Sequence, residues 1–431
     1  MKVTALSLEQ TPPLSVPLRF FLTAPVFVVA AAIVLLWNGH AALDSRWTPP
    51  LLAATHFLTL GFLTMIMAGA IQQLLPVLMA SPVPRPRLTS AVIHLVLTLG
   101  TLSLGAGMLT GKGGLFLGAL VVLGAGLIFF VLMVMFCLFQ ARSSHATVFV
   151  MGLAVIALLV TAGLGILLAA GHGLDSVPLF RTLTDLHLLW GMLGWVGLLV
   201  IGVAYQVVPM FQLTPNYPGL LMRWLPRILF AGLSIWGMGL LFPEERKWLQ
   251  WIGGGGVVGS FAAFSFMTLR LQQQRRRRLS DINIDFWRLA LVCLLAAMGL
   301  WTAQGFLQLP QTELLLGVLL VAGFAMSVVS GMLYKIVPFL VWLHLNNYMQ
   351  ATGRWGEQIP NMKQILPSQR SRLQFWLQFS ALLLLLLAAV WPGPFIRPAA
   401  LTMLAAFSLL WWNLLDGLRL YYRYIGAGEE G

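Results

Sequence analysis

Long apolar stretches, separated by short segments rich in Pro, Gly and charged residues, recur along the whole chain. A helix needs about 20 apolar residues to cross the hydrocarbon core of a bilayer. Stretches of about this length or longer predict spans at about 17–37, 51–80, 88–110, 114–141, 145–171, 183–213, 224–243, 248–270, 285–308, 312–344, 373–391 and 398–420. We therefore predict an all-α polytopic membrane protein of about twelve transmembrane helices, which form a single transmembrane domain over residues 1–431.

The composition excludes several classes of protein. Of the 431 residues, 59% are hydrophobic and only 9% are charged, whereas a soluble domain carries about a quarter charged residues. A soluble enzyme, a disordered tail and a coiled coil are therefore excluded. The two cysteines, Cys137 and Cys293, lie inside apolar stretches, so a disulfide framework is excluded too.

The basic residues indicate an orientation. The chain has 26 Lys and Arg against 13 Asp and Glu, a net charge of +13. On the predicted topology most of these basic residues, including the run Arg275 to Arg278, lie at the termini and in the even-numbered loops. Because basic loops stay in the cytoplasm, we predict a bacterial-type inner membrane protein with both termini cytoplasmic. Its partner is the lipid bilayer, and nucleic acid binding is not expected.

Three of the predicted spans, at 51–80, 183–213 and 312–344, share one pattern when they are aligned on a proline. The matching positions are Gly61, Phe62, Gly69, Gln73 and Pro76 in the first span, Gly194, Trp195, Gly202, Gln206 and Pro209 in the second, and Gly323, Phe324, Gly331, Lys335 and Pro338 in the third. The chain is therefore predicted to contain three pseudo-repeated units of four helices, centred on these spans.

The pattern has a structural and a functional interpretation. Glycine allows close helix packing and proline bends a transmembrane helix, so packing alone accounts for these two residue types. Packing accounts less well for Gln73, Gln206 and Lys335, which recur at one depth, because polar groups inside a membrane are costly. They predict a polar layer in the inner third of the membrane.

Four of the seven histidines fall towards the outer side of the predicted topology: His40, His56, His172 and His187. His56 and His187 stand near the starts of two of the repeat spans. Imidazoles on facing helices are ligands for heme iron or copper, so these four histidines are the candidate metal ligands. For His40, His172 and His145 an interfacial hydrogen bond is the alternative, and His94 is predicted to bond to a neighbouring helix.

Together these features resemble a known superfamily. Three units of four helices, with an outer histidine on the second helix, resemble subunit I of the heme-copper oxidases. The stretch from His56 through Gln73 and Pro76 to Ser81–Arg87 is similar to that family's second helix, where the histidine binds the low-spin heme. The resemblance is closest to the NnrS family of heme- and copper-containing membrane proteins linked to nitric oxide stress, and it is carried by the spacing of His56, Gly61, Phe62, Gly69 and Pro76. It is specific over about 35 residues and architectural elsewhere.

Departures from the oxidase pattern limit what the resemblance implies. The oxidases place further heme and copper ligands on their sixth, seventh and tenth helices. Here the span at 224–243 contains no histidine, and the span at 312–344 has none before His344. The spans also carry almost no carboxylates. Proton-pumping oxygen reduction is therefore not expected.

Two classes of function follow. The first is a heme b protein, with copper as a further candidate, that binds NO or O2, serves a stress response or transfers respiratory electrons with a redox partner. His56 and His187 would be ligands, and the macrocycle would contact Gly61, Phe62, Gly194 and Trp195. Arg46 or Arg181 would pair with heme propionates, or else be exposed loop charges.

The second class needs no cofactor. A transporter or channel would use Gln73, Gln206 and Lys335 as a polar constriction, unless Lys335 only extends its charge to the membrane surface. An accessory protein that kept the oxidase architecture after losing its chemistry is a further alternative. No residue pattern identifies a catalytic group, and an oligomer is compatible with either class.

Overall fold

The computed structural model describes residues 11–141, 146–174, 180–242, 246–276, 280–307, 311–354 and 358–426. All regular secondary structure in these segments is helical, and twelve of the helices within them are long and apolar enough to cross a membrane. The prediction of an all-α polytopic membrane protein is confirmed. His145, Arg142 and two arginines of the basic run, Arg277 and Arg278, lie outside the described residues.

Most spans are single helices. They are α1 (Ser15–Asn38, extended by η2, Gly39–Leu43), α4 (Pro86–Thr110), α5 (Gly113–Gln140), α6 (Ala146–Gly173), α9 (Gly219–Leu241), α10 (Lys247–Gln273), α11 (Ile282–Ala303), α15 (Ser368–Val390) and α16 (Pro392–Gly426). A short helix, α14 (Met362–Ile365), precedes α15. It begins with a capping box in which Asn361 and Gln364 each bond to the other's backbone N–H.

The three spans with the sequence repeat are each interrupted by a π-helical segment. The first consists of α2 (Pro49–His56), η3 (Phe57–Thr64) and α3 (Met65–Met79), the second of α7 (Arg181–Leu188), η4 (Leu189–Val196) and α8 (Gly197–Gln212), and the third of α12 (Thr312–Gly317), η5 (Val318–Ala325) and α13 (Met326–Ala351). Each π-helical segment contains the Gly–aromatic pair of its repeat. The sequence repeat therefore has a counterpart in backbone geometry. Segments of π-helix are rare and occur frequently at functional sites.

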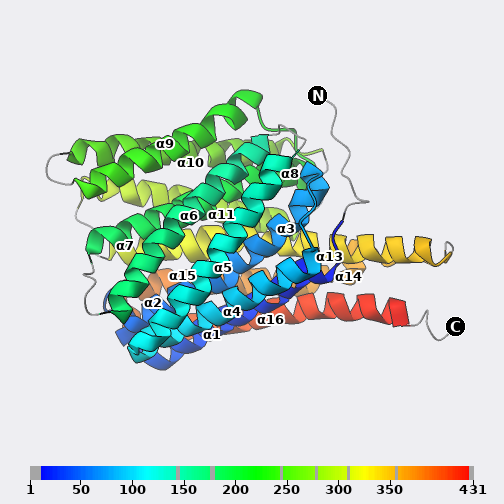
Figure 1. Cartoon of the computed structure of the whole chain (residues 1–431), viewed down its shortest axis with the longest axis horizontal. Coiled ribbons are helices and arrows are strands. Elements are labelled where there is room, and N and C mark those ends of the chain that lie inside the picture. The colour runs from blue at the N-terminus through cyan, green and yellow to red at the C-terminus, as the bar shows by residue number, and fades with distance from the viewer. Residues whose placement is uncertain are drawn as a thin grey trace.

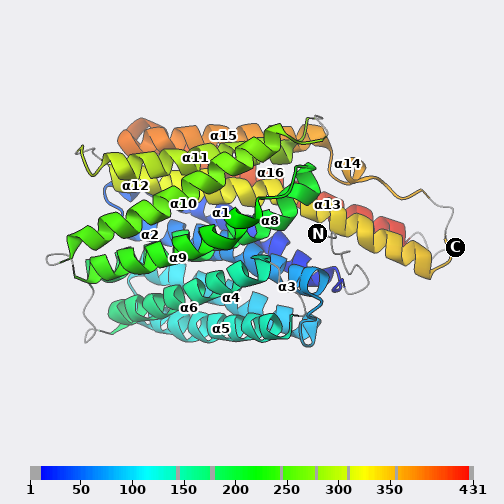
Figure 2. The same ribbon diagram turned by 90° about the horizontal axis from the view of Figure 1, so that it is seen from above.

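These composite spans form the centre of the bundle. Their most apolar windows are 67%, 72% and 56% buried, against 33–50% for the other spans. The π-helical segment η5 packs against both η3 and η4. The single helices surround them in packed pairs such as α4 with α5, α9 with α10, and α15 with α16 (Figure 2).

The helices run along the long axis of the molecule, and α1 begins and α16 ends at the same end of the bundle (Figure 1). We call this end the terminal face and the other end the opposite face. The helices α2 and α7 (Figure 1) and α12 (Figure 2) begin at the opposite face, whereas α13 and α16 project beyond the rest of the bundle at the terminal face. The composite spans therefore all run in the same direction.

The repeat ends differently in its third copy. In the first two copies the helix stops four residues after its proline, at Ala80 (φ 49°) and Leu213 (φ 54°), both of which are left-handed. This conformation is unfavourable for residues with a Cβ atom. In the third copy α13 continues past Pro338 to Ala351, beyond the end at 344 that the apolar pattern predicted.

Candidate functional site

His56 and His187 lie side by side near the opposite face. His56 is the last residue of α2 and directly precedes the π-helical segment η3. His187 is the second-last residue of α7, so one residue separates it from η4. Their ring centroids are 6.2 Å apart and their ring planes differ by 27°. The structure thus brings together the two histidines that the repeat spans contribute, although 131 positions separate them in the chain.

Both imidazoles are held through the same ring nitrogen. His56 Nδ1 lies 2.8 Å from the carbonyl oxygen of Leu52, one turn earlier in the same helix. His187 Nδ1 lies 3.0 Å from the carbonyl oxygen of Thr161, on α6. Because a carbonyl oxygen can only accept, these partners assign the proton to Nδ1 and leave Nε2 with a free lone pair. Metal-binding histidines are oriented by outer hydrogen bonds of this kind.

The separation of the two rings fits a single metal between them. A metal–imidazole bond of about 2.0–2.1 Å, plus about 1.1 Å from nitrogen to ring centre, gives about 6.3 Å when the two ligands stand on opposite sides of the metal. A tetrahedral angle would shorten this to about 5 Å. The observed 6.2 Å is therefore compatible in length with two imidazoles that hold one metal, and the two ring planes differ by only 27°.

The other candidate ligands are placed differently. His172 is exposed and stacks on Phe116 of α5, with ring centroids 5.0 Å apart. His40 is exposed on η2. Within the described segments, no group of three or more His, Cys, Asp or Glu side chains could hold a metal ion. The candidate site is therefore the pair of His56 and His187.

The remaining described histidines make hydrogen bonds inside the bundle. His94 Nε2 lies 2.8 Å from Thr23 Oγ1 on α1, which confirms the predicted bond to a neighbouring helix. His344 Nδ1 lies 2.9 Å from the carbonyl oxygen of Leu340, and its Nε2 lies 3.1 Å from that of Pro12. His344 thus fastens the start of the chain to α13.

Charged side chains link the three composite spans at the opposite face. Arg46, just before α2, lies 2.7 Å from Asp185 of α7 and 3.0 Å from Glu313 of α12. Arg181 of α7 lies 2.6 Å from the same Glu313. The sequence suggested propionate partners or exposed loop charges for the two arginines. The structure gives both arginines carboxylate partners, and so each unit of the repeat contributes to one ionic cluster.

Gly61 and Phe62 are engaged in helix packing. A Cβ atom on Gly61 would lie 2.3 Å from the Phe27 ring, so α1 fills the space beside this glycine. Phe62 is fully buried and meets the edge of Phe407 on α16, at a centroid distance of 5.3 Å. Neither residue faces open space in this arrangement.

Gly194 and Trp195 are also engaged in helix packing. A Cβ atom on Gly194 would lie 2.9 Å from Cβ of Ala157 on α6. Trp195 Nε1 donates to Thr64 Oγ1 at 3.2 Å. The imidazole pair therefore has the chemistry of a ligand set for iron or copper. Neighbouring side chains fill the space beside Gly61 and Gly194, so these glycines leave no room there for a macrocycle. Contact of the glycines and their aromatic neighbours with a heme stays a prediction.

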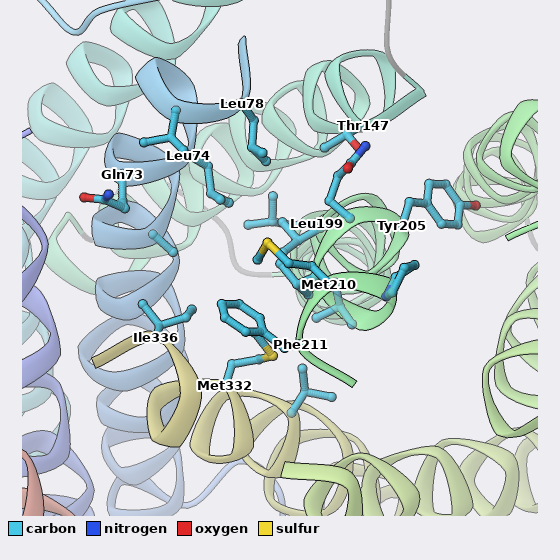
Figure 3. Close-up of a pocket in the computed structure, with 18 of the residues that line it drawn as sticks. Gln73, Leu74, Leu78, Thr147, Leu199, Tyr205, Met210, Phe211, Met332 and Ile336 are labelled. Atoms are coloured by element: carbon cyan, nitrogen blue, oxygen red, sulfur yellow. The ribbon is translucent and has the colours of Figure 1, made fainter. Parts of the chain in front are cut away.

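The three residues of the predicted polar layer do not form a ring. Gln73 and Gln206 line a cavity of about 680 Å³ beside α3 and α8, which lie in the half of the bundle nearer the terminal face (Figure 1), and Figure 3 shows Gln73 at the edge of this cavity. Lys335 does not line it; its Nζ lies 2.5 Å from Asp281 Oδ2. Asp281 also caps the start of α11 by accepting from the backbone N–H of Asn283. The ammonium is thus neutralised by a partner on another helix.

A buried chain of amides, which the sequence analysis missed, joins four helices near the same depth. Gln272 Nε2 donates to Gln212 Oε1 at 3.0 Å, and Gln212 Nε2 donates to Asn283 Oδ1 at 2.9 Å. Asn283 Nδ2 in turn donates to the carbonyl oxygen of Gly331 at 2.8 Å. The only signal in the sequence was the position of these amides at the ends of apolar stretches.

Comparison with models of known protein families gives no match, and comparison with curated proteins gives none either. The resemblance to the heme-copper oxidases and to NnrS therefore stays a hypothesis carried by the residues quoted from the sequence.

Proposed function

We propose that this protein is an integral membrane metalloprotein in which His56 and His187 ligate one metal centre, either the iron of a b-type heme or a copper ion. One observation carries the proposal. The two rings are 6.2 Å apart, and each donates its Nδ1 proton to a backbone carbonyl, so that both Nε2 lone pairs are free.

The arrangement favours electron transfer over gas binding. A heme or copper centre supplies one-electron redox chemistry when bound. His56 and His187 would both be used in holding such a group, so a diatomic gas would have to compete with a protein side chain for it. His56 is held within its own helix, whereas His187 is held by Thr161 of α6. We expect His187 to be the ligand that yields, because its position depends on a second helix.

The proposal extends to location and biological context. Because basic segments favour the cytoplasm, the terminal face would lie in the cytoplasm of a bacterial-type cell, and the histidine pair would lie towards the outer side of the inner membrane. A redox partner would then approach the face formed by the starts of α2, α7 and α12. The resemblance to NnrS and the oxidases supports a role in respiration or in the response to nitric oxide.

Absorption spectra and metal analysis test this function. We expect the full-length protein, purified in detergent after expression with ample heme and copper, to show heme bands that sharpen on reduction with dithionite, or to contain about one copper per chain. His56→Ala and His187→Ala should each remove the signal. His40→Ala, which changes an exposed histidine at the same face, is the matched control. A colourless protein without copper would overturn the proposal.

A cofactor-free transporter or channel is the second candidate, and the cavity lined by Gln73 and Gln206 is the observation that favours it. The same preparation separates the two functions. The second candidate would be favoured if vesicles that contain the His56→Ala, His187→Ala double variant transport a solute at the same rate as vesicles that contain the unsubstituted protein. Loss of spectrum and activity together would favour the first.

A further inference from the structure

The cavity between α3, α8 and α13 plays no part in the proposed metal site. It measures about 680 Å³, within the ~300–1,000 Å³ typical of small-molecule pockets. Its walls are mainly aliphatic, aromatic and methionine side chains of the three composite spans. Figure 3 shows Leu74 and Leu78, Met210 and Phe211, and Met332 and Ile336 around the space. The lining suits a flexible hydrocarbon chain, because methionine adapts its shape to irregular ligands.

Some polar atoms of the lining residues lack a partner. Gln73 Oε1, Thr147 Oγ1, Tyr205 OH and Trp287 Nε1 are buried and have no hydrogen-bond partner among the described residues. Leaving such groups unsatisfied is unfavourable by about 1–3 kcal/mol each. Figure 3 shows Gln73 and Tyr205 at opposite edges of the space, with the Gln73 amide and the Tyr205 hydroxyl directed away from it. Gln73 and Tyr205 therefore leave the space between the helices mainly apolar.

One charged residue, Arg276, is found among the described residues that line the cavity, and no carboxylate accompanies it. Arg276 is exposed, and its backbone N–H donates to the carbonyl oxygen of Leu213 at 3.0 Å. This bond fixes the start of the basic run beside the end of α8. A ligand with a negative head at Arg276 and an apolar body between the helices would match both parts of the lining.

We propose that this cavity binds a long-chain anionic amphiphile, with its chain between α3, α8 and α13 and its carboxylate or phosphate head at Arg276. A free fatty acid and an anionic phospholipid both have this chemistry. A neutral amphiphile would gain nothing from Arg276, and a cationic one would be repelled by it. The site lies apart from the histidine pair, so the proposal does not depend on the metal.

Photochemical labelling of the full-length protein in detergent tests the proposal. The probes are a fatty acid with a diazirine on its chain, the methyl ester of the same compound, and an anionic phospholipid that carries the same diazirine chain. We expect the fatty acid to label peptides of α3, α8 or α13, and to do so at lower concentration than its ester. The phospholipid arm identifies the source, since whichever anionic probe competes more strongly is the better ligand.

Two pairs of variants make the test specific. Arg276→Gln should raise the concentration of fatty acid needed for half-maximal labelling by about fivefold, the upper range for an exposed ion pair, and leave the ester unchanged. Arg275→Gln, its neighbour outside the lining, is the control. Val203→Phe should fill the cavity and reduce labelling at least about tenfold, whereas Val121→Phe on the exposed surface of α5 should not.

Folding of each variant is checked by its elution in size-exclusion chromatography. If Val203→Phe elutes as an aggregate, Leu74→Trp fills the cavity from α3 instead. Labelling confined to exposed helix surfaces, or retained in the folded cavity-filling variant, would overturn the site. Equal labelling by acid and ester, or equal effects of Arg275→Gln and Arg276→Gln, would overturn the anionic head group.

Discussion

Lys335 and Asp281 form an ion pair between α13 and the first turn of α11, with Nζ 2.5 Å from Oδ2. About a quarter of each side chain is exposed, 25% and 24% respectively. The pair therefore lies where water still reaches, which limits its contribution to stability. The ion pair also holds the Lys335 ammonium away from the cavity that Gln73 and Gln206 line.

The ion pair and the cap of Asp281 can be separated by mutation. Asp281→Asn keeps a good N-cap and removes the charge, whereas Asp281→Ala removes both. We expect Asp281→Asn and Lys335→Met to couple by about 0.2–1 kcal/mol in a double-mutant cycle, and Asp281→Ala to be less stable than Asp281→Asn by about 1 kcal/mol. Thermal unfolding in detergent measures both. Additive effects of the two charge-removing changes would show that the pair contributes nothing.

The close packing of Gly61 against Phe27 makes a second prediction. A methyl group at position 61 would lie 2.3 Å from the ring, so Gly61→Ala must displace α1 or η3, and we expect it to destabilise the protein by about 1–3 kcal/mol. Gly259→Ala on α10 is the control, because nothing lies within 4 Å of its Cβ position. There the change should be neutral or stabilising by about 0.5–1 kcal/mol. Equal melting temperatures for the two variants would contradict the packing described.

The ionic cluster at the opposite face predicts a dependence on salt. Arg46→Gln leaves Asp185 without its cation and removes one of the two cations at Glu313. We expect a loss of about 1 kcal/mol at low salt, and a smaller loss at high salt because screening weakens interactions between exposed charges. Lys112→Gln, an exposed change at the same face, should have little effect at either salt concentration. A loss that does not vary with salt would argue for packing rather than charge.

A fourth prediction concerns the position of His187 and rests on the proposed metal site. A Cβ atom on Gly165 would lie 3.1 Å from His187 Cε1, so Gly165→Ala should tilt the ring without removing a ligand. Changes to groups that orient a metal ligand weaken binding by about 10–100-fold, and we expect about tenfold here. The visible spectrum should shift as well. Metal titration and spectroscopy measure these two effects.

Gly163→Ala is the matched control for that variant. It lies two residues away on the same helix and has nothing within 4 Å of its Cβ position. We expect its metal affinity and spectrum to equal those of the unsubstituted protein. If the two glycine variants behave alike, His187 is not positioned by contact with α6.

The three copies of the repeat show which features the local sequence pattern predicts and which it does not. The spacing of Gly, aromatic residue and Pro in the sequence singles out three spans, and each of them contains a π-helical segment at the Gly–aromatic pair. The π-helical geometry itself was not predicted, because a π-turn depends on the neighbours that pack against the helix rather than on local propensity. The same holds for Gly61, whose close neighbour Phe27 belongs to another helix.

The sequence by itself determined the number of spans and their approximate limits, because a bilayer demands apolar stretches of fixed length. Tertiary structure alone decided which side chains meet: His56 with His187, Lys335 with Asp281, and Gln73 with Gln206 around one cavity. In a soluble helix the apolar stripe indicates which side faces the core. These helices are apolar on all sides, so their rotation, and with it every contact of the candidate sites, was fixed only by packing.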